Sequence, residues 1–186
     1  EERQWLRSIQ DQGVLILKML DDFNNLYKLE IGTYQLNAFH FDIDEICTDI
    51  LTQLAYFKAV KQVRMNKDYV NDSGKERICL KADYNLCHSM LTNLIKNAVE
   101  ASPGGEDIDI EIRPDDNALA IRNKGEVPKA IRENFFEKYV TDGKKNGTGI
   151  GTYSAKLIAN AHGWNLDLDC SVPGETTVHI AFHDAN

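Results

Sequence analysis

Apolar residues recur at helical spacing near the start of this 186-residue chain, over residues 4–31. Acidic and amide side chains separate them, which predicts a long helix with one or more apolar stripes to bury. Gly32 follows as the expected C-cap of that helix. The segment is too polar to cross a membrane. The apolar stripes consist of Leu6, Ile9, Val14, Leu17, Leu20, Phe23 and Leu26.

From residue 34 onward, helix-type and strand-type patterns alternate along the chain. We expect an α+β fold, a two-layer sandwich in which helices cover one face of a mixed sheet, preceded by the long N-terminal helix. Strand patterns fall near residues 35–41, 63–69, 77–82, 108–112, 118–121, 164–170 and 176–182. Helix patterns run from a cap at Asp42 or Asp44 to about Lys61, from Asp83 to about 102, and over 148–161.

The helix that follows Asp83 carries two amides in its second half. Asn93 and Asn97 lie four residues apart, beside a stripe that predicts the buried face of this helix. Two amide oxygens one turn apart can coordinate a hydrated Mg²⁺, because Mg²⁺ takes oxygen ligands and keeps several waters when it bridges phosphates. Two ordinary surface amides would give the same pattern. The stripe consists of Leu91, Leu94, Ile95, Ala98 and Val99.

A glycine-rich segment leads into the last predicted helix, with glycines at positions 143, 147, 149 and 151. Glycine permits positive φ and close approach to an anion, and a helix N-terminus offers unpaired N–H groups, so the segment indicates a phosphate site. It is neither a Walker loop, since Gly143-Lys144 is followed by Lys145, nor a dinucleotide fingerprint. A flexible surface turn remains the alternative interpretation.

Composition and charge limit the classes of partner. The net charge of −8 and the pI near 5.1 argue against duplex nucleic acid or an anionic membrane surface as the main partner. We read the cysteines as reduced structural thiols of a cytoplasmic protein, because they lack the paired spacing of a zinc site and no signal peptide precedes them. They lie at positions 47, 79, 87 and 170.

Four segments in order resemble the nucleotide-binding boxes of the sensor histidine kinase catalytic domain, a member of the Bergerat-fold ATPase and kinase superfamily. Asn93-Leu-Ile-Lys-Asn97-Ala resembles the N box, and residues 121–128 lie where the G1 box is expected. Phe135-Phe136-Glu137-Lys138-Tyr139 resembles the F box, and Gly143 to Gly151 resembles the G2 box.

The resemblance implies a site for ATP and Mg²⁺. Asn97 would be the principal Mg²⁺ ligand with Asn93 as its helper, and the amide oxygen of Asn123 would accept a hydrogen bond from the adenine amino group. Lys138, Lys144 or Lys145 could face phosphate. The expected nucleotide-binding residues are Asn93, Asn97, Asn123, Gly125, Lys138, Tyr139, Gly143, Lys144, Lys145, Gly147, Thr148, Gly149, Ile150 and Gly151.

The resemblance also implies transfer of the γ-phosphoryl group to a histidine of a dimerisation hairpin, for relay to a response regulator receiver domain. Residues 1–33 resemble the second helix of that hairpin, and residues 34–186 the catalytic domain. The hairpin's first helix, with its phosphoacceptor histidine, is missing, so we expect no autophosphorylation by these residues alone. The full-length protein is expected to be a homodimer, with this part in the cytoplasm, either of a soluble protein or of a membrane-bound sensor.

Two departures from the family pattern keep alternatives open. Asn123 stands where the G1 box has aspartate, and Glu100 and Ala101 stand where many members have lysine and an aromatic residue. A degenerate relative that acts as a conformational partner is therefore the alternative to an active kinase. A serine-kinase anti-sigma factor of the same fold is disfavoured by the helix at residues 4–31.

Overall fold

The computed structural model describes residues 2–71, 73–75, 77–141 and 149–183. The chain divides into two compact units, Glu1–Gln35 and Leu36–Asn186, each of which is described by itself. Within the described residues, none of the helices combines the length and the apolar character that a membrane span requires.

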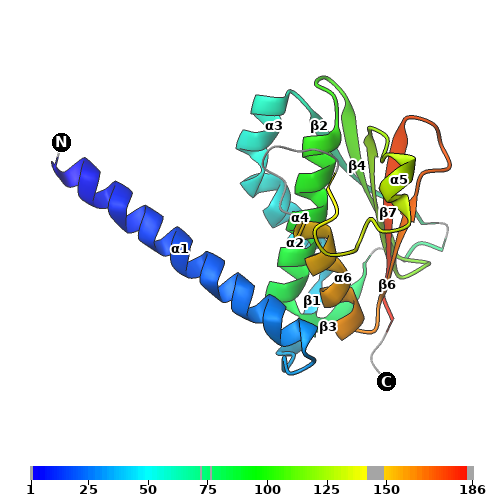
Figure 1. Cartoon of the computed structure of the whole chain (residues 1–186). Coiled ribbons are helices and arrows are strands. Elements are labelled where there is room, and N and C mark those ends of the chain that lie inside the picture. The colour runs from blue at the N-terminus through cyan, green and yellow to red at the C-terminus, as the bar shows by residue number, and fades with distance from the viewer. Residues whose placement is uncertain (1, 72, 76, 142–148, 184–186) are drawn as a thin grey trace. The chain divides into compact units, whose positions relative to one another are not determined.

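The first unit is a single long helix, α1 (Glu2–Glu30), as the apolar spacing predicted (Figure 1). It ends at Gly32, whose φ of +69° is the left-handed conformation that glycine adopts without strain. The Thr33 N–H donates to the Lys28 carbonyl oxygen at 2.9 Å, which satisfies one carbonyl of the last turn. Much of its apolar surface is exposed, namely Trp5, Leu6, Ile9, Val14, Ile16, Leu17, Met19, Leu20, Phe23 and Tyr27.

The second unit is built on a five-stranded sheet with the strand order β2-β4-β5-β7-β6. Strands β2 and β4 run parallel, and the other neighbours are antiparallel, so the sheet is mixed as predicted. Its strands are β2 (Arg64–Tyr69), β4 (Asp107–Arg113), β5 (Ala118–Lys124), β6 (Asn165–Asp169) and β7 (Glu175–Ala181).

Two further strands form a separate small sheet. Strand β1 (Ala38–Asp42) pairs antiparallel with β3 (Cys79–Asp83). The sequence predicted both strands but not their pairing, because the partners are far apart along the chain. Strand β3 leads directly into α4 (Tyr84–Ala101), and Asp83 caps that helix by accepting a hydrogen bond from the Leu86 N–H at 3.2 Å.

Within the second unit, the longer helices lie on one face of the five-stranded sheet (Figure 1). Helix α4 packs against β5 and against α6 (Gly151–Ala161), which places two helices over the centre of the sheet. The prediction of a single helix from Asp42 to Lys61 is wrong, because this stretch forms two helices. It breaks at buried Leu54 into α2 (Ile43–Gln53) and α3 (Ala55–Lys61), and a short helix, α5 (Lys129–Arg132), was not predicted.

Alternation along β4 and β5 separates the core from the solvent. Ile108, Ile110 and Ile112 are fully buried beneath the helices. On the opposite face, charged side chains pair across strands, for example Arg64 with Asp107 at 2.6 Å. The same alternation brings Ile121 and Asn123 of β5 to the inner face, where Asn123 stands opposite Thr176 of β7. A polar pair is thereby placed inside an otherwise apolar layer.

Candidate functional site

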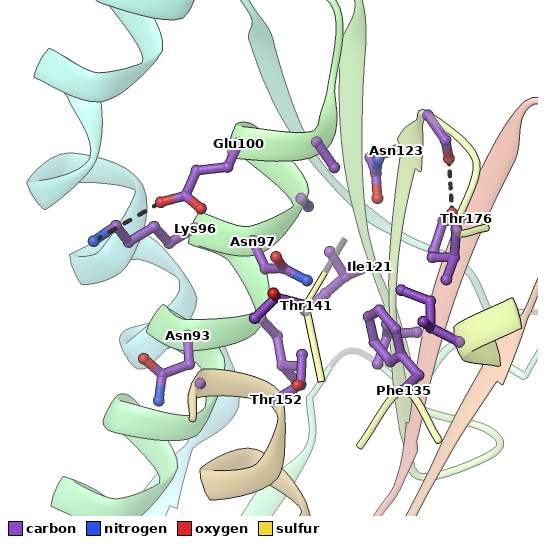
Figure 2. A pocket seen from close by; sticks show the side chains of 18 of the residues that line it. Asn93, Lys96, Asn97, Glu100, Ile121, Asn123, Phe135, Thr141, Thr152 and Thr176 are labelled. Atoms are coloured by element: carbon purple, nitrogen blue, oxygen red, sulfur yellow. Dashed lines mark hydrogen bonds and ion pairs between the residues drawn. The ribbon is translucent and has the colours of Figure 1, made fainter. Parts of the chain in front are cut away.

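A pocket of about 520 Å³ opens between α4 and the inner face of the sheet (Figure 2). Residues 93–101 of α4 form one wall, and residues of β5 and β7 form the opposite wall. The segment between β5 and α6 contributes the remaining lining, together with the first turn of α6. The volume falls within the range of sites that bind cofactors and other small molecules.

The α4 wall presents the two predicted amides, since both Asn93 and Asn97 line the pocket. Figure 2 shows Asn97 pointing from α4 towards Ile121 of β5. The apolar stripe of the same helix is buried as predicted, which fixes the rotation of α4 and thus the direction of its amides. Asn93 lies beside the first turn of α6, where a Cβ on Gly151 would lie 3.9 Å from the Asn93 Cβ.

The other end of the pocket is formed by Asn123, Gly125 and Thr176. Asn123 is only 5% exposed, and its Nδ2 donates to the Lys124 carbonyl oxygen at 2.9 Å. This bond assigns the amide orientation, and Figure 2 shows the Oδ1 end on the side of the pocket. The Thr176 hydroxyl donates to the Gly125 carbonyl oxygen at 2.7 Å. Asn123 and Thr176 therefore each bond to a backbone carbonyl of the turn that follows β5.

Gly125 must be glycine for steric reasons. Its φ is +129°, and a Cβ there would lie 2.7 Å from the carbonyl oxygen of Ala101 at the end of α4. Its N–H donates to the Gly174 carbonyl oxygen at 2.9 Å. The backbone after β5 therefore passes close to the C-terminus of α4, and this contact closes the Asn123 end of the pocket.

A backbone hydrogen bond joins the end of the predicted F box to Gly149, which lies just before α6. The Tyr139 N–H donates to the Gly149 carbonyl oxygen at 3.0 Å. Tyr139 has a φ of +67°, unusual for a residue with a side chain, and a Cβ on Gly149 would lie 2.6 Å from the Tyr139 carbonyl carbon. The chain then enters α6 through Ile150, whose side chain makes no capping hydrogen bond. Since Gly151 and Thr152 line the pocket, the N-terminus of α6 borders it.

His162 connects the end of α6 to the start of α4. Its Nδ1–H donates to the Ile158 carbonyl oxygen at 2.8 Å, and its Nε2 accepts from the Asp83 N–H at 3.1 Å. These two bonds assign the neutral tautomer. The ring is 6% exposed and stacks on Trp164 at 4.5 Å. Burial disfavours the imidazolium and lowers the pKa of His162 below its ordinary value of 6.5.

The predicted site residues fall into three groups. Pocket-lining residues are Asn93, Asn97, Asn123, Gly125, Gly149 and Gly151. Described residues that do not line it are Lys138, Tyr139 and Ile150. Lys138 instead places its ammonium 5.6 Å from the ring centroids of both Tyr139 and Tyr153. Predictions that lie outside the described residues are Gly143, Lys144, Lys145, Gly147 and Thr148.

Sequence reasoning missed several lining residues, of which Thr176 is the most informative. The strand pattern over 175–181 places Thr176 on the same face as Val178 and Ile180, so a polar residue at an inward-facing position was the available signal. Thr141 and Thr152 also contribute hydroxyl groups to the lining. No pattern in the sequence distinguished these two from surface threonines.

The charges around the pocket are mixed among its described residues. Lys96, Glu100 and Glu126 line it, and Glu126 pairs with Arg132 at 2.5 Å. The described residues hold no group of three or more His, Cys, Asp or Glu side chains that could form a metal cage. Asn93 and Asn97 contribute amide oxygens to the lining, the type of ligand that Mg²⁺ takes when it keeps most of its waters and bridges phosphates.

A mixed sheet covered on one face by helices, with a pocket between the sheet and a helix that carries two asparagines, defines a nucleotide-binding domain of the Bergerat class. The chain belongs to the family of histidine kinase-, DNA gyrase B- and HSP90-like ATPases, whose model matches residues 82–186. Within this family it is the ATP-binding catalytic domain of a sensor histidine kinase.

Relatives and solved structures agree with this assignment. The circadian input-output histidine kinase CikA of Synechocystis sp. is 24% identical over 192 residues, which cover 96% of this chain and 24% of that protein. Histidine kinase AdeS of Acinetobacter baumannii superposes with a TM-score of 0.72 at 18% identity, covering 97% of this chain and 84% of that one. Full-length ShkA in complex with AMPPNP gives a TM-score of 0.72 at 17% identity, covering 98% and 40%. The chain thus spans about a quarter of the length of its relative CikA.

Proposed function

We propose that the pocket between α4 and the sheet binds ATP together with Mg²⁺, and that the domain positions the γ-phosphoryl group for transfer to a histidine. The observation that carries the proposal is that Asn97 and Asn123, distant in sequence, line one pocket with the N-terminus of α6. The AMPPNP complex of ShkA, which has the same fold, supports a nucleotide as the ligand.

The Asn123 end suits the adenine base. Because its Nδ2 is engaged by the Lys124 carbonyl, Asn123 offers its amide oxygen as an acceptor for the adenine amino group. Ile121, Val178 and Phe135 supply apolar surface for the ring. Gly125 and Thr176 fix the position of the turn beside it through their 2.7 Å hydrogen bond.

The Asn93 end suits the phosphates. The first turn of α6 presents backbone N–H groups and the positive end of the helix dipole to that part of the pocket, which favours an anion. Asn97 is the proposed principal Mg²⁺ ligand and Asn93 its helper. Bound Mg²⁺–ATP would supply the γ-phosphoryl group with part of its charge neutralised. The predicted phosphate contacts of the glycine-rich loop remain part of this proposal.

The acceptor in the proposed reaction is a histidine on the dimerisation hairpin, of which α1 would be the second helix. The exposed apolar side chains of α1 are consistent with a helix that packs in an assembly. The histidine ring nitrogen would take the phosphoryl group with ADP as the leaving group, and a response regulator receiver domain would take it next. Hydrolysis is expected to be slow, because Asn93 cannot act as a general base toward water.

A degenerate, non-catalytic relative is the second candidate. Two observations favour it: a neutral amide at Asn123 in the base pocket, and a carboxylate at Glu100 among the lining residues. Such a protein would bind nucleotide, or none, and act as a conformational partner, so binding and transfer must be measured separately.

The test of binding is calorimetric titration of the chain with ADP and an unhydrolysable ATP analogue, with Mg²⁺ and with chelator. Asn97→Ala is expected to remove the Mg²⁺-dependent part of the affinity without unfolding the domain. Asn160→Ala, the same change at an exposed position of α6, is the control and should bind as the unmodified chain does. Equal affinities of Asn97→Ala and the control under both conditions would contradict the assignment.

The test of transfer uses a hairpin bearing the phosphoacceptor histidine, supplied in trans with labelled ATP. We expect acid-labile phosphohistidine on the hairpin and none on the 186-residue chain incubated alone. Nucleotide binding without any transfer would favour the degenerate relative.

A further inference from the structure

An ion pair lies on the rim of the pocket, and the role assigned to it below rests on the proposed binding of a nucleotide. Lys96 and Glu100 of α4 both line the pocket, and their charged atoms, Nζ and Oε1, are 4.0 Å apart. Figure 2 shows both side chains projecting from α4 on the side opposite to Asn97. They would therefore act on a bound ligand through their charge, from outside the space into which Asn97 points.

Glu100 occupies a place that is electrostatically unfavourable for a carboxylate. It lies in the last turn of α4, where the helix dipole is negative and the last carbonyl groups lack helical partners. One of these, the Glu100 carbonyl oxygen, accepts a hydrogen bond from Lys61 Nζ at 3.1 Å. A neutral or basic residue would suit the helix end better.

The pairing with Lys96 compensates only weakly. Lys96 precedes Glu100 by four residues, which is the less favourable order for an ion pair on a helix. The two side chains are 46% and 39% exposed, so that solvent screens their attraction. Two opposite charges thus lie on one rim, where solvent screens their mutual attraction.

We propose that Glu100 is a specificity-determining residue that makes the pocket select the Mg²⁺ complex of a nucleotide over the metal-free nucleotide, with Lys96 acting in the opposite sense. A carboxylate on the rim repels a polyphosphate in proportion to the ligand's net negative charge. Metal-free ADP carries two more negative charges than its Mg²⁺ complex. For two charges about 8 Å apart in a water-like dielectric, Coulomb's law gives about a twofold change in the binding constant per unit of ligand charge and about fivefold for two units, and less at a greater separation.

The experiment compares Glu100→Gln with the unmodified chain by calorimetric titration with adenosine, metal-free ADP and Mg²⁺–ADP. Glu100→Gln is expected to lower the ratio of the metal-free to the Mg²⁺–ADP dissociation constant about fivefold, and to leave adenosine binding unchanged. Lys96→Gln should raise the same ratio. Both shifts should shrink in 0.5 M salt, because exposed charges are screened. Glu45→Gln, the same charge change at an exposed residue of α2, should leave the ratio as it is.

Several outcomes would overturn the inference. One is an equal change for all three ligands in Glu100→Gln, which would indicate a change of shape rather than of charge. Another is a ratio that moves no more than it does in the Glu45→Gln control. Thermal unfolding verifies that each variant is folded, and Glu100→Gln should unfold at a slightly higher temperature because the helix end is relieved of a carboxylate. Failure of the unmodified chain to bind any form of ADP would overturn the proposed function and this inference together, whereas ADP binding that ignores Glu100 would overturn the inference alone.

Discussion

Replacing Asn123 with aspartate should separate two roles of this buried amide. Asn123→Asp changes one atom, the Nδ2 that donates to the Lys124 carbonyl oxygen at 2.9 Å. An ionised aspartate cannot donate there and would place a carboxylate oxygen against a carbonyl oxygen, at a position only 5% exposed. The same carboxylate is a stronger acceptor for an adenine amino group than the amide is. The substitution should therefore lower the unfolding free energy of the free protein and raise its affinity for adenine nucleotides.

The size of each effect follows from these contacts. Losing the hydrogen bond and leaving the Lys124 carbonyl without its donor costs about 1–3 kcal/mol of unfolding free energy, and the buried charge adds to it. A charge-assisted hydrogen bond to adenine should make the free energy of ADP binding more favourable by about 1 kcal/mol, or roughly fivefold in affinity. A protonated aspartate can donate to Lys124 again, so the penalty should be smaller at pH 5 than at pH 8.

Urea unfolding at both pH values and calorimetric titration with ADP and GDP measure the two roles. Asn165→Asp, the same change at an exposed position of β6, controls for the added charge. It should change neither the unfolding free energy nor the affinity for ADP. Guanine presents a carbonyl where adenine presents its amino group, so GDP affinity should not improve. An unchanged unfolding free energy in Asn123→Asp, or equal tightening for ADP and GDP, would refute the placement of Asn123 in a base pocket.

Two further predictions follow from local contacts. Gly125→Ala should cost about 1–3 kcal/mol of unfolding free energy and weaken ADP binding, because φ is +129° and the new Cβ would lie 2.7 Å from the Ala101 carbonyl oxygen. Gly151→Ala is the control and should leave the unfolding free energy nearly unchanged, because the nearest atom to its Cβ would be 3.9 Å away. Equal unfolding midpoints for the two variants would contradict this steric explanation. The contribution of His162 to the unfolding free energy should be constant above about pH 7 and decline as the pH falls below 6.5, because His162 binds a proton more readily in the unfolded chain than in its buried position. The decline is at most about 1.4 kcal/mol per pH unit. His162→Gln should abolish this pH dependence, whereas His40→Gln, at an exposed position, should leave it unchanged.

Local patterns along the chain predicted most of the helices and strands and the class of chemistry. Helical spacing predicted α1 and the buried stripe of α4, and period-two alternation predicted the hairpin of β4 and β5. These features are local, since each depends on residues within one or two turns or strands. The spacing of Asn93 and Asn97 and the glycines near the start of α6 indicated a nucleotide site for the same reason. Alternation of helix and strand patterns then limited the architecture to a mixed sheet with helices on one face.

Which of these residues meet depends on long-range packing. Asn123 and Thr176 face each other because β5 pairs with β7, a long-range contact that no local pattern encodes. The break at Leu54 and the separate sheet of β1 and β3 likewise depend on packing between segments that are distant in the chain. The same holds for Gly125, because the Ala101 carbonyl oxygen at the end of α4 would lie 2.7 Å from a Cβ at this position. Local propensity fixes which elements form, whereas the pocket exists because their inner faces must share one core.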